Sequence, residues 1–352
     1  MLIQLYVLRQ LLVALFFALG ILAVIVFPTV AVQAVNKLGA ISFDLMAGYL
    51  PLVVAGLVPY LLPMAFLLAV VATYGRLAAE RELIAIQMAG VHPAGLVLPG
   101  LVVALPLVFV TDHLLAEIAP DLKYEQRNVV RKADVERFLT SMQSRNVLTF
   151  GKNVLKSEST TGNVKSNVQL DMEFEEKLVK VVAREARLTV EGELLVVRMK
   201  DARLLTEDSS LDNENPSYAW SLQELFAQAP KDRKRAKYNP TSELSAQLAQ
   251  PELEPEMRAE ILYAIHRRHA LSAIYLLFLL LGLPTGLVLR SSTHLGAFTG
   301  AIGYAFLYYV LDMRLGAVLA EAGAVPPVVA AWATNGLFLV VGVVLCVRTL
   351  WR

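Results

Sequence analysis

The stretch Tyr74–Pro93, YGRLAAERELIAIQMAGVHP, decides how the rest of the chain is interpreted, because it is a charged segment between two long apolar runs. Arg76, Glu80, Arg81 and Glu82 fall within seven residues of it, and the segment then becomes apolar. Ala, Leu, Glu, Arg and Met are good helix formers, and residues four apart share one face of a helix. The composition therefore predicts a short helix with a solvated first half.

Gly90 and Pro93 are typical of the residues that follow a helix end. The predicted helix is then tethered at both ends to apolar segments, and a groove on a soluble partner can hold such a helix. The alternative is a solvated helix that only links two membrane spans.

The composition indicates an integral membrane protein with a soluble insert. The chain has 352 residues, of which 56% are hydrophobic and 18% charged, and its mean hydropathy is +0.54. Soluble proteins have about 45–50% apolar and about 25% charged residues. The charged residues crowd into positions 112–268 and are scarce on either side.

Charge and cysteine content exclude several classes of function. The net charge is +1, so no global field attracts nucleic acid. Cys346 is the only cysteine, which rules out a disulfide framework within the chain and a cysteine-based metal site. A soluble insert without cysteine is compatible with an oxidising compartment.

Six apolar runs are candidates for spans, since a helix needs about 20 apolar residues to cross a bilayer. They are residues 11–36, 45–75, 96–111, 269–289, 295–311 and 322–347. A secretory signal peptide is the rival interpretation of the first run, but the run is longer than the about 7–15 residues of a signal h-region. Pro51, Pro59 and Pro63 predict that the second span is kinked or begins near Val58.

The polar segment 121–265 has the pattern of a small antiparallel sheet with flanking helices. Apolar and polar residues alternate from Val168 to Phe174 and again from Val179 to Ala183, at the period of a strand. Glu191-Gly192 lies between two more such runs and predicts a hairpin. We expect a sandwich-like or jelly-roll-like domain, with helices before and after it.

Three spans, a β domain and three more spans give the plan of the chain: residues 1–120, 121–265 and 266–352. The short loops hold more arginine on the side of the N-terminus than on the other side, which favours a cytoplasmic N-terminus. The charged helix, within residues 74–92, is then cytoplasmic and the β domain extracytoplasmic.

No catalytic motif stands out. The chain lacks a GxxxxGK[ST] phosphate loop, and no histidine lies between His113 and His266. Serine–lysine or carboxylate-pair chemistry stays open, because such residues are abundant and unpatterned. The predicted spans carry few ionisable residues, whereas ion-coupled transporters place such residues near the midplane. Energy for any uphill transport must therefore come from a partner.

Three segments carry a resemblance to a known family. YGRLAAERELIAIQMAGVHP resembles the cytoplasmic coupling helix of the LptF/LptG family of lipopolysaccharide export permeases. HRRHALSAIYLLFLLLGLPTGLVLR at 266–290 resembles the family's fourth span, and VPPVVAAWATNGLFLVVGVVLCVR at 325–348 resembles its last. The order of spans and β domain matches over nearly the whole chain.

The resemblance implies a multi-pass subunit of an ABC-type exporter in the bacterial inner membrane, with no catalytic residue, metal or cofactor of its own. It implies as partners a cytoplasmic ATPase dimer, a sister permease and a periplasmic bridge of similar jelly rolls. Lipopolysaccharide is the implied cargo, extracted from the inner membrane and passed to the bridge through the periplasmic β domain.

The resemblance also implies roles for particular residues. The ATPase is expected to contact Arg76, Glu80, Arg81, Glu82 and Gly90, with Glu82 at the family's acidic position. Lipid contacts are expected at Lys37, Arg267, Arg268, Val168, Leu170, Met172 and Phe174. The alternatives are that Lys37 is an interface anchor and that the strand residues form an ordinary sandwich core.

Two other classes of function remain as alternatives. The chain resembles ATPase-driven mechanotransmission proteins in having a coupling helix and an external domain, although those commonly insert the domain after the first span. A membrane-anchored extracytoplasmic enzyme is the third class. The choice between an F-like and a G-like member, and the exact lipid, stay open.

Overall fold

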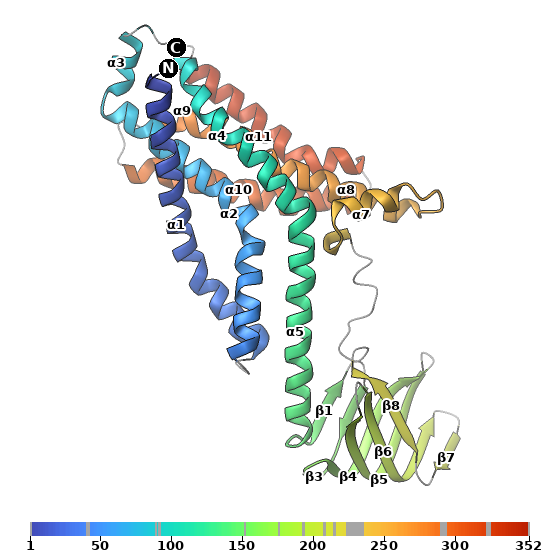
Figure 1. The fold of residues 1–352 in the computed structure, drawn as a ribbon. Coiled ribbons are helices and arrows are strands. Elements are labelled where there is room, and N and C mark those ends of the chain that lie inside the picture. The colour runs from blue at the N-terminus through green and yellow to red at the C-terminus, as the bar shows by residue number, and fades with distance from the viewer. Residues whose placement is uncertain are drawn as a thin grey trace. The chain divides into compact units, whose positions relative to one another are not determined.

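A computed structural model of the chain describes residues 2–39, 43–88, 90, 93–150, 153–174, 177–191, 194–206, 209–213, 216–222, 236–288, 294–321 and 325–350 (Figure 1). The chain forms two compact units. The helical unit comprises Met1–Val32, Pro51–Tyr124 and Ala236–Arg352, and the β unit comprises Gln33–Leu50 and Glu125–Arg235. Each unit is described by itself.

The helices before the sheet are α1 (Leu2–Leu38), α2 (Phe43–Ala79), α3 (Glu82–Met88), α4 (Val97–His113) and α5 (Ala119–Met142). The helices after the sheet are α7 (Thr241–Leu248), α8 (Pro255–Ser272), α9 (Ile274–Val288), α10 (His294–Glu321) and α11 (Pro327–Leu350). A π-helical turn, Leu114–Ile118, joins α4 to α5.

Five helical segments of the described residues are long and apolar enough to cross a membrane: Leu2–Leu38, Phe43–Ala79, Val97–Met142, Pro255–Val288 and Pro327–Thr349. The expected membrane character is thus confirmed. The helix α10, which the sequence predicts as another span, has 28 residues but is not among these five.

The helix α2 begins at Phe43 and not near Val58, and Figure 1 shows it changing direction along its length, as the alternative of a kinked span predicts. It is continuous over 37 residues, with Pro51, Pro59 and Pro63 inside it. At 1.5 Å per residue such a helix is about 55 Å long, well beyond the about 30 Å of a bilayer's hydrocarbon core.

The helix α9 forms the centre of the helical unit and is buried from Ile274 to Leu287 apart from Leu276 and Leu280. It packs against α4, α10 and α11. Gly282 and Gly286 of α9 also allow α2 to approach closely. A Cβ on Gly286 would lie 2.9 Å from the Val71 carbonyl oxygen and 3.0 Å from the Gly75 nitrogen. The two backbones are therefore in direct contact at Gly75 and Gly286, as in other close helix crossings in membranes.

The β unit is an eight-stranded antiparallel sheet with β1 (Val147–Phe150), β2 (Asn153–Lys156), β3 (Ser159–Thr161), β4 (Val164–Phe174), β5 (Lys177–Glu191), β6 (Leu194–Thr206), β7 (Ser209–Asn213) and β8 (Ser217–Ser221). The order is β1-β2-β4-β5-β6-β7, with β3 beside β4 and β8 beside β6. The antiparallel sheet is confirmed, and β5 and β6 form the predicted hairpin, because Glu191 pairs with Leu194. The order β4-β5-β6-β7 is a meander, and the Greek-key connections of a jelly roll are not established by it.

One crease crosses three strands of the sheet. Asn167 on β4 and Asp201 on β6 have positive φ angles of 49° and 50°, and Arg184 on β5 lies between them in register. Buried residues on β5 change parity there, from Val181 and Ala183 before Arg184 to Ala186 and Leu188 after it. Asn and Asp tolerate this left-handed backbone better than other non-glycine residues.

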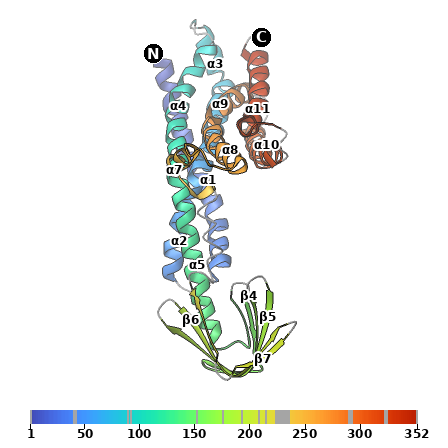
Figure 2. The same cartoon turned by 90° about the vertical axis from the view of Figure 1, so that its right-hand side faces the viewer.

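The crease lets both arms of the sheet bury apolar residues on the same concave side, and Figure 2 shows the arms meeting in a V. The core includes Leu170, Leu188 and Val197 from the strands together with Phe138 and Met142 from the end of α5. The last turns of α5 therefore contribute to the core of the β unit.

Candidate functional site

The charged stretch lies at a break between α2 and α3. The sequence predicts one helix within residues 74–92 that ends near Gly90, but the structure ends α2 at Ala79 and begins α3 at Glu82. The break occurs because Arg81 has a left-handed backbone with φ 61°. The Arg81 carbonyl then accepts hydrogen bonds from the Ile84 and Ala85 amides at 3.1 and 3.3 Å, which start the new helix.

Gly90 ends α3, as its position in the sequence predicts. Its φ is 83°, a conformation that favours glycine, and its amide donates to the Gln87 carbonyl at 2.9 Å. The 3-10 turn Pro93–Leu96 leads from there into α4.

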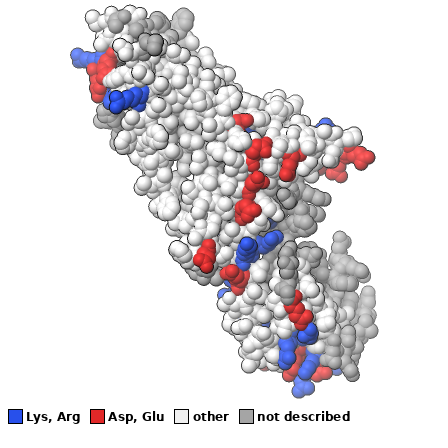
Figure 3. Space-filling model, in the orientation of Figure 1, with Lys and Arg blue, Asp and Glu red and all other residues white. Residues whose placement is uncertain are grey.

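Two faces of α3 have different surroundings. Ile86 is buried in the core of the helical unit, whereas Ile84 is 45% and Met88 84% exposed. Ile84 and Met88 are four residues apart, so they share one face of the helix. Figure 3 shows charged side chains at the end of the helical unit that carries α3, beside a broad surface without charges. Sequence reasoning did not select Ile84 and Met88, although their spacing was a usable signal.

Glu82 has a partner on another helix. The Tyr6 hydroxyl of α1 donates to its carboxylate, with both oxygens at 3.0 Å. Glu82 also stands at the first position of α3, where the helix dipole stabilises a negative charge. Arg76, Glu80 and Arg81 are exposed. Nothing in the sequence indicates Tyr6, because the contact joins two segments far apart in the chain.

The ends of the charged segment are fixed to the helical core. The buried Tyr74 hydroxyl donates to the Leu96 carbonyl, which links the last turns of α2 to the start of α4. Gly75 is in the α2–α9 crossing described above. These contacts connect the charged segment to α4 and α9.

Arg268 is a buried hub where the chain returns from the β unit to the helices. Its guanidinium donates to the carbonyls of Ala116, Ala236 and Asn239 at 3.2, 3.0 and 2.9 Å, and to the Thr241 hydroxyl at 2.8 Å. The side chain is thus engaged with the protein's own backbone.

The π-helical turn is part of the same junction. The Glu117 carboxylate accepts hydrogen bonds from the Ser242 amide at 3.1 Å and from the Ser242 hydroxyl at 2.8 Å. It caps α7, whose own N-cap residue, Pro240, makes no side-chain cap. π-helical turns often occur at functional sites, so the turn Leu114–Ile118 is a candidate functional element.

Arg267 points elsewhere and pairs with Asp312 of α10. The distance from Nη2 to the Asp312 carboxylate is 2.7 Å, and Asp312 is buried. Arg267 also lines a cavity of about 290 Å³ with Lys123, Lys237 and Glu260. A guanidinium has five N–H donors, so Arg267 keeps donors beyond those that bind Asp312.

Lys37 lies in the last turn of α1, in the β unit, and its side chain is exposed. Its backbone carbonyl accepts a hydrogen bond from Arg137 of α5 at 3.2 Å. Among the described residues, no carboxylate pairs with the Lys37 ammonium.

The predicted acyl-chain residues are in the interior of the creased sheet. Val168 and Leu170 are fully buried and Met172 is 6% exposed, in one cluster with Phe138 and Met142 of α5. The side chain of Phe174 lies outside the described part of the structure.

No group of three or more His, Cys, Asp or Glu side chains among the described residues could hold a metal ion. The fold and the site define a class: a multi-pass membrane protein with an inserted antiparallel β unit and a short helix, next to a charged break, between two membrane helices. The family model for the lipopolysaccharide export system permeases LptF/LptG matches residues 5–348, and the chain belongs to that family. A comparison with curated proteins found no match.

Proposed function

We propose that the chain is the membrane subunit of an ABC-type exporter, in which a cytoplasmic ATPase dimer moves α3 and thereby opens a route for lipopolysaccharide out of the membrane. The family membership supports a permease of lipopolysaccharide export. The observation that carries the ATPase coupling is the α2–α3 break. It presents Ile84 and Met88 as an exposed apolar pair on the same short helix as Glu82.

A groove on the ATPase would take the apolar pair, and charged groups around the groove would pair with Glu82 and the neighbouring charges. The push would then travel through Tyr74 to α4 and through the Gly75–Gly286 contact to α9. We assign Arg76, Glu80, Arg81, Glu82 and Gly90 to this ATPase contact, as the sequence resemblance implies.

The lipid-facing roles are the other part of the proposal. Lys37 and Arg267 are our first candidates for lipid phosphate, because the Lys37 ammonium is exposed and Arg267 lines a cavity. Arg268 would support the same region by holding the returning chain. Val168, Leu170 and Met172 would meet acyl chains only where the α5 residues Phe138 and Met142 give way.

The assembly follows from these assignments. The N-terminus and α3 would face the cytoplasm, and the β unit would face the periplasm and meet a jelly-roll bridge. Six spans, with α10 among them, would lie in the bacterial inner membrane beside a sister permease. The mechanotransmission alternative lacks a supporting observation in this chain, because the family match is to export permeases.

The variant Glu82→Arg tests the coupling. We expect co-purification with the ATPase to fall more than tenfold and export to fail, because charge reversal at an interface costs several kcal/mol. Glu185→Arg, at an exposed site on β5, is the matched control and should change neither readout. A Glu82→Arg subunit that retains its ATPase and complements export would defeat the proposal.

A further inference from the structure

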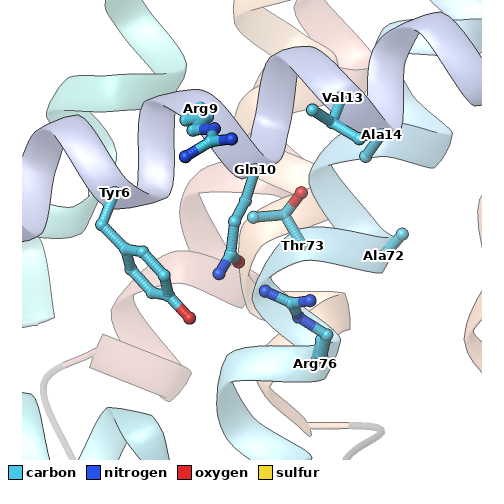
Figure 4. Close-up of a pocket in the computed structure, with 8 residues that line it drawn as sticks. All are labelled: Tyr6, Arg9, Gln10, Val13, Ala14, Ala72, Thr73 and Arg76. Carbon is cyan, nitrogen blue, oxygen red and sulfur yellow. The ribbon is translucent and has the colours of Figure 1, made fainter.

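A cavity of about 480 Å³ lies between the N-terminal part of α1 and the C-terminal part of α2. It is lined by Tyr6, Arg9, Gln10, Val13, Ala14, Ala72, Thr73 and Arg76 (Figure 4). All of these residues belong to the helical unit. Figure 4 shows Gln10 of α1 and Arg76 of α2 reaching from the two helices toward the same space.

The cavity has positive charge for which the described residues supply no paired carboxylate. Arg9 and Arg76 line it from opposite helices, and both are exposed. Among the described residues, no carboxylate pairs with either arginine. Glu82 does not serve here, because its described partner is Tyr6. Two guanidinium groups of this kind favour a phosphate, which they can bind through paired N–H donors.

The cavity also holds polar atoms that lack a partner. Gln10 Oε1 and Thr73 Oγ1 are buried and have no hydrogen-bond partner, and Thr73 is only 4% exposed. Buried polar groups are normally hydrogen-bonded, so an unpaired pair in one cavity points to an occupant. The Gln10 oxygen can only accept a hydrogen bond. An occupant that carries a donor, such as a hydroxyl, in addition to the negative charge would satisfy these atoms.

A second, apolar hollow lies further along α1. Val13 and Ala14 form one wall of the cavity. One turn further on, a groove of about 540 Å³ is lined by Phe16, Phe17, Gly20, Ile21, Val24 and Ile25. Phe16 and Val24 are 75% and 74% exposed. A charged end followed by an apolar groove on one helix matches an amphiphile with an acyl chain.

We propose that this cavity binds the head group of an anionic phospholipid with a hydroxylated head, such as phosphatidylglycerol. Arg9 and Arg76 hold the phosphate, the head-group hydroxyls donate to Gln10 and Thr73, and an acyl chain follows the groove along α1. The lipid belongs to the leaflet on the side of α3. Calling that leaflet cytoplasmic rests on the proposed function, but the binding itself does not.

The position gives the lipid an effect on coupling. Arg76 is in the last turn of α2 and Tyr6 holds Glu82 at the start of α3. A lipid bridging Arg9 and Arg76 ties α1 to α2 directly before the α2–α3 break. Its presence then stiffens the connection through which α3 moves the other helices.

Native mass spectrometry of the purified full chain, without any ATPase, tests the binding. The detergent solution contains equimolar phosphatidylglycerol and phosphatidylcholine. We expect preferential retention of phosphatidylglycerol, and the double variant Arg9→Gln, Arg76→Gln should lower that preference on the order of 30-fold. The matched control is Arg348→Gln, an exposed arginine in the last turn of α11, which should retain the preference.

A second pair of variants tests the head-group hydroxyls. Gln10→Leu with Thr73→Val should abolish discrimination between phosphatidylglycerol and phosphatidic acid while the preference over phosphatidylcholine persists. Equal retention of phosphatidylglycerol and phosphatidylcholine by the wild type overturns the proposal. An unchanged preference for phosphatidylglycerol in the double arginine variant also overturns it. Displacement of the lipid by millimolar inorganic phosphate would mark the cavity as a free-anion site and also overturn it. Failure of the ATPase contact leaves all of these readouts unaffected.

Discussion

Tyr6 and Glu82 are 76 positions apart in the sequence. The Tyr6 hydroxyl of α1 nevertheless donates a hydrogen bond to the Glu82 carboxylate of α3. A single hydroxyl proton is shared between two carboxylate oxygens, so Glu82 can turn toward another donor with little loss. A hydrogen bond to a charged group contributes about 1.5–3 kcal/mol at most, and less when the pair is exposed as this one is. That range suits a carboxylate that exchanges one partner for another during a transport cycle.

Lys165 on β4 is a fully buried amine whose position predicts a pH-dependent stability. It donates to the Arg145 carbonyl at 2.6 Å and to the Thr160 hydroxyl at 3.0 Å, and burial lowers the pKa of its ammonium. The folded state therefore binds the proton less well than the unfolded state. Stability rises with pH between the lowered folded pKa and the ordinary value near 10.5.

We expect Lys165→Met to remove this part of the pH dependence. Hydrogen exchange of the β3–β4 hairpin in the full chain, measured from about pH 7 to about pH 10, should show protection that rises less steeply in the variant than in the wild type. The exposed residue Lys200 provides the control, and Lys200→Met should match the wild-type slope. Parallel slopes for wild type and Lys165→Met would contradict the assignment.

At the scale of the element, periodicity was a good guide to the strands and a poor one to breaks and crossings. The alternation at Val168–Phe174 predicted β4 correctly, because one face of a strand is buried and the other is not. The crease at Asn167 and Asp201 was missed, since Asn and Asp are equally common in ordinary turns. The break at Arg81 was missed because arginine is a good helix former, and tertiary packing overrides that preference.

The α2–α9 crossing could not be predicted from the sequence. Several other glycines of this chain have open space around them, and the sequence does not distinguish them from a glycine at a crossing. A Cβ on Gly303 or Gly336 would meet nothing within 4 Å, whereas one on Gly286 would clash with the α2 backbone. Composition cannot distinguish these glycines, but the partner helix does. The site residues show the same limit: the charged segment was selected from its sequence, and its contacts with Tyr6 and α9 were not.

Gly286→Ala should force α2 and α9 apart. The added Cβ would lie 2.9 Å from a backbone oxygen and 3.0 Å from a backbone nitrogen, neither of which can rotate away. We expect a loss of about 1–3 kcal/mol in stability, measured by thermal unfolding in detergent. Gly303→Ala is the matched control on α10 and should unfold like the wild type. Equal melting temperatures for the two variants would argue against a tight crossing.

At the scale of the whole molecule, the proposal requires that α3 and the β unit face opposite sides of the membrane. Met88 on α3 is 84% exposed, and Lys200 on β6 is exposed, so each position accepts a cysteine without disturbing the core. Cys346 is the only native cysteine, so Cys346→Ser provides a background without reactive thiols. In spheroplasts, a membrane-impermeant maleimide should label Lys200→Cys at once and Met88→Cys only after the membrane is opened. An ATPase confined to the cytoplasm can push only a helix that it can touch, and a periplasmic bridge can meet only a sheet on its own side. Labelling of both cysteines in sealed spheroplasts would place α3 and the β unit on the same side of the membrane. It would therefore contradict the proposed mechanical connection between ATP hydrolysis and lipid release.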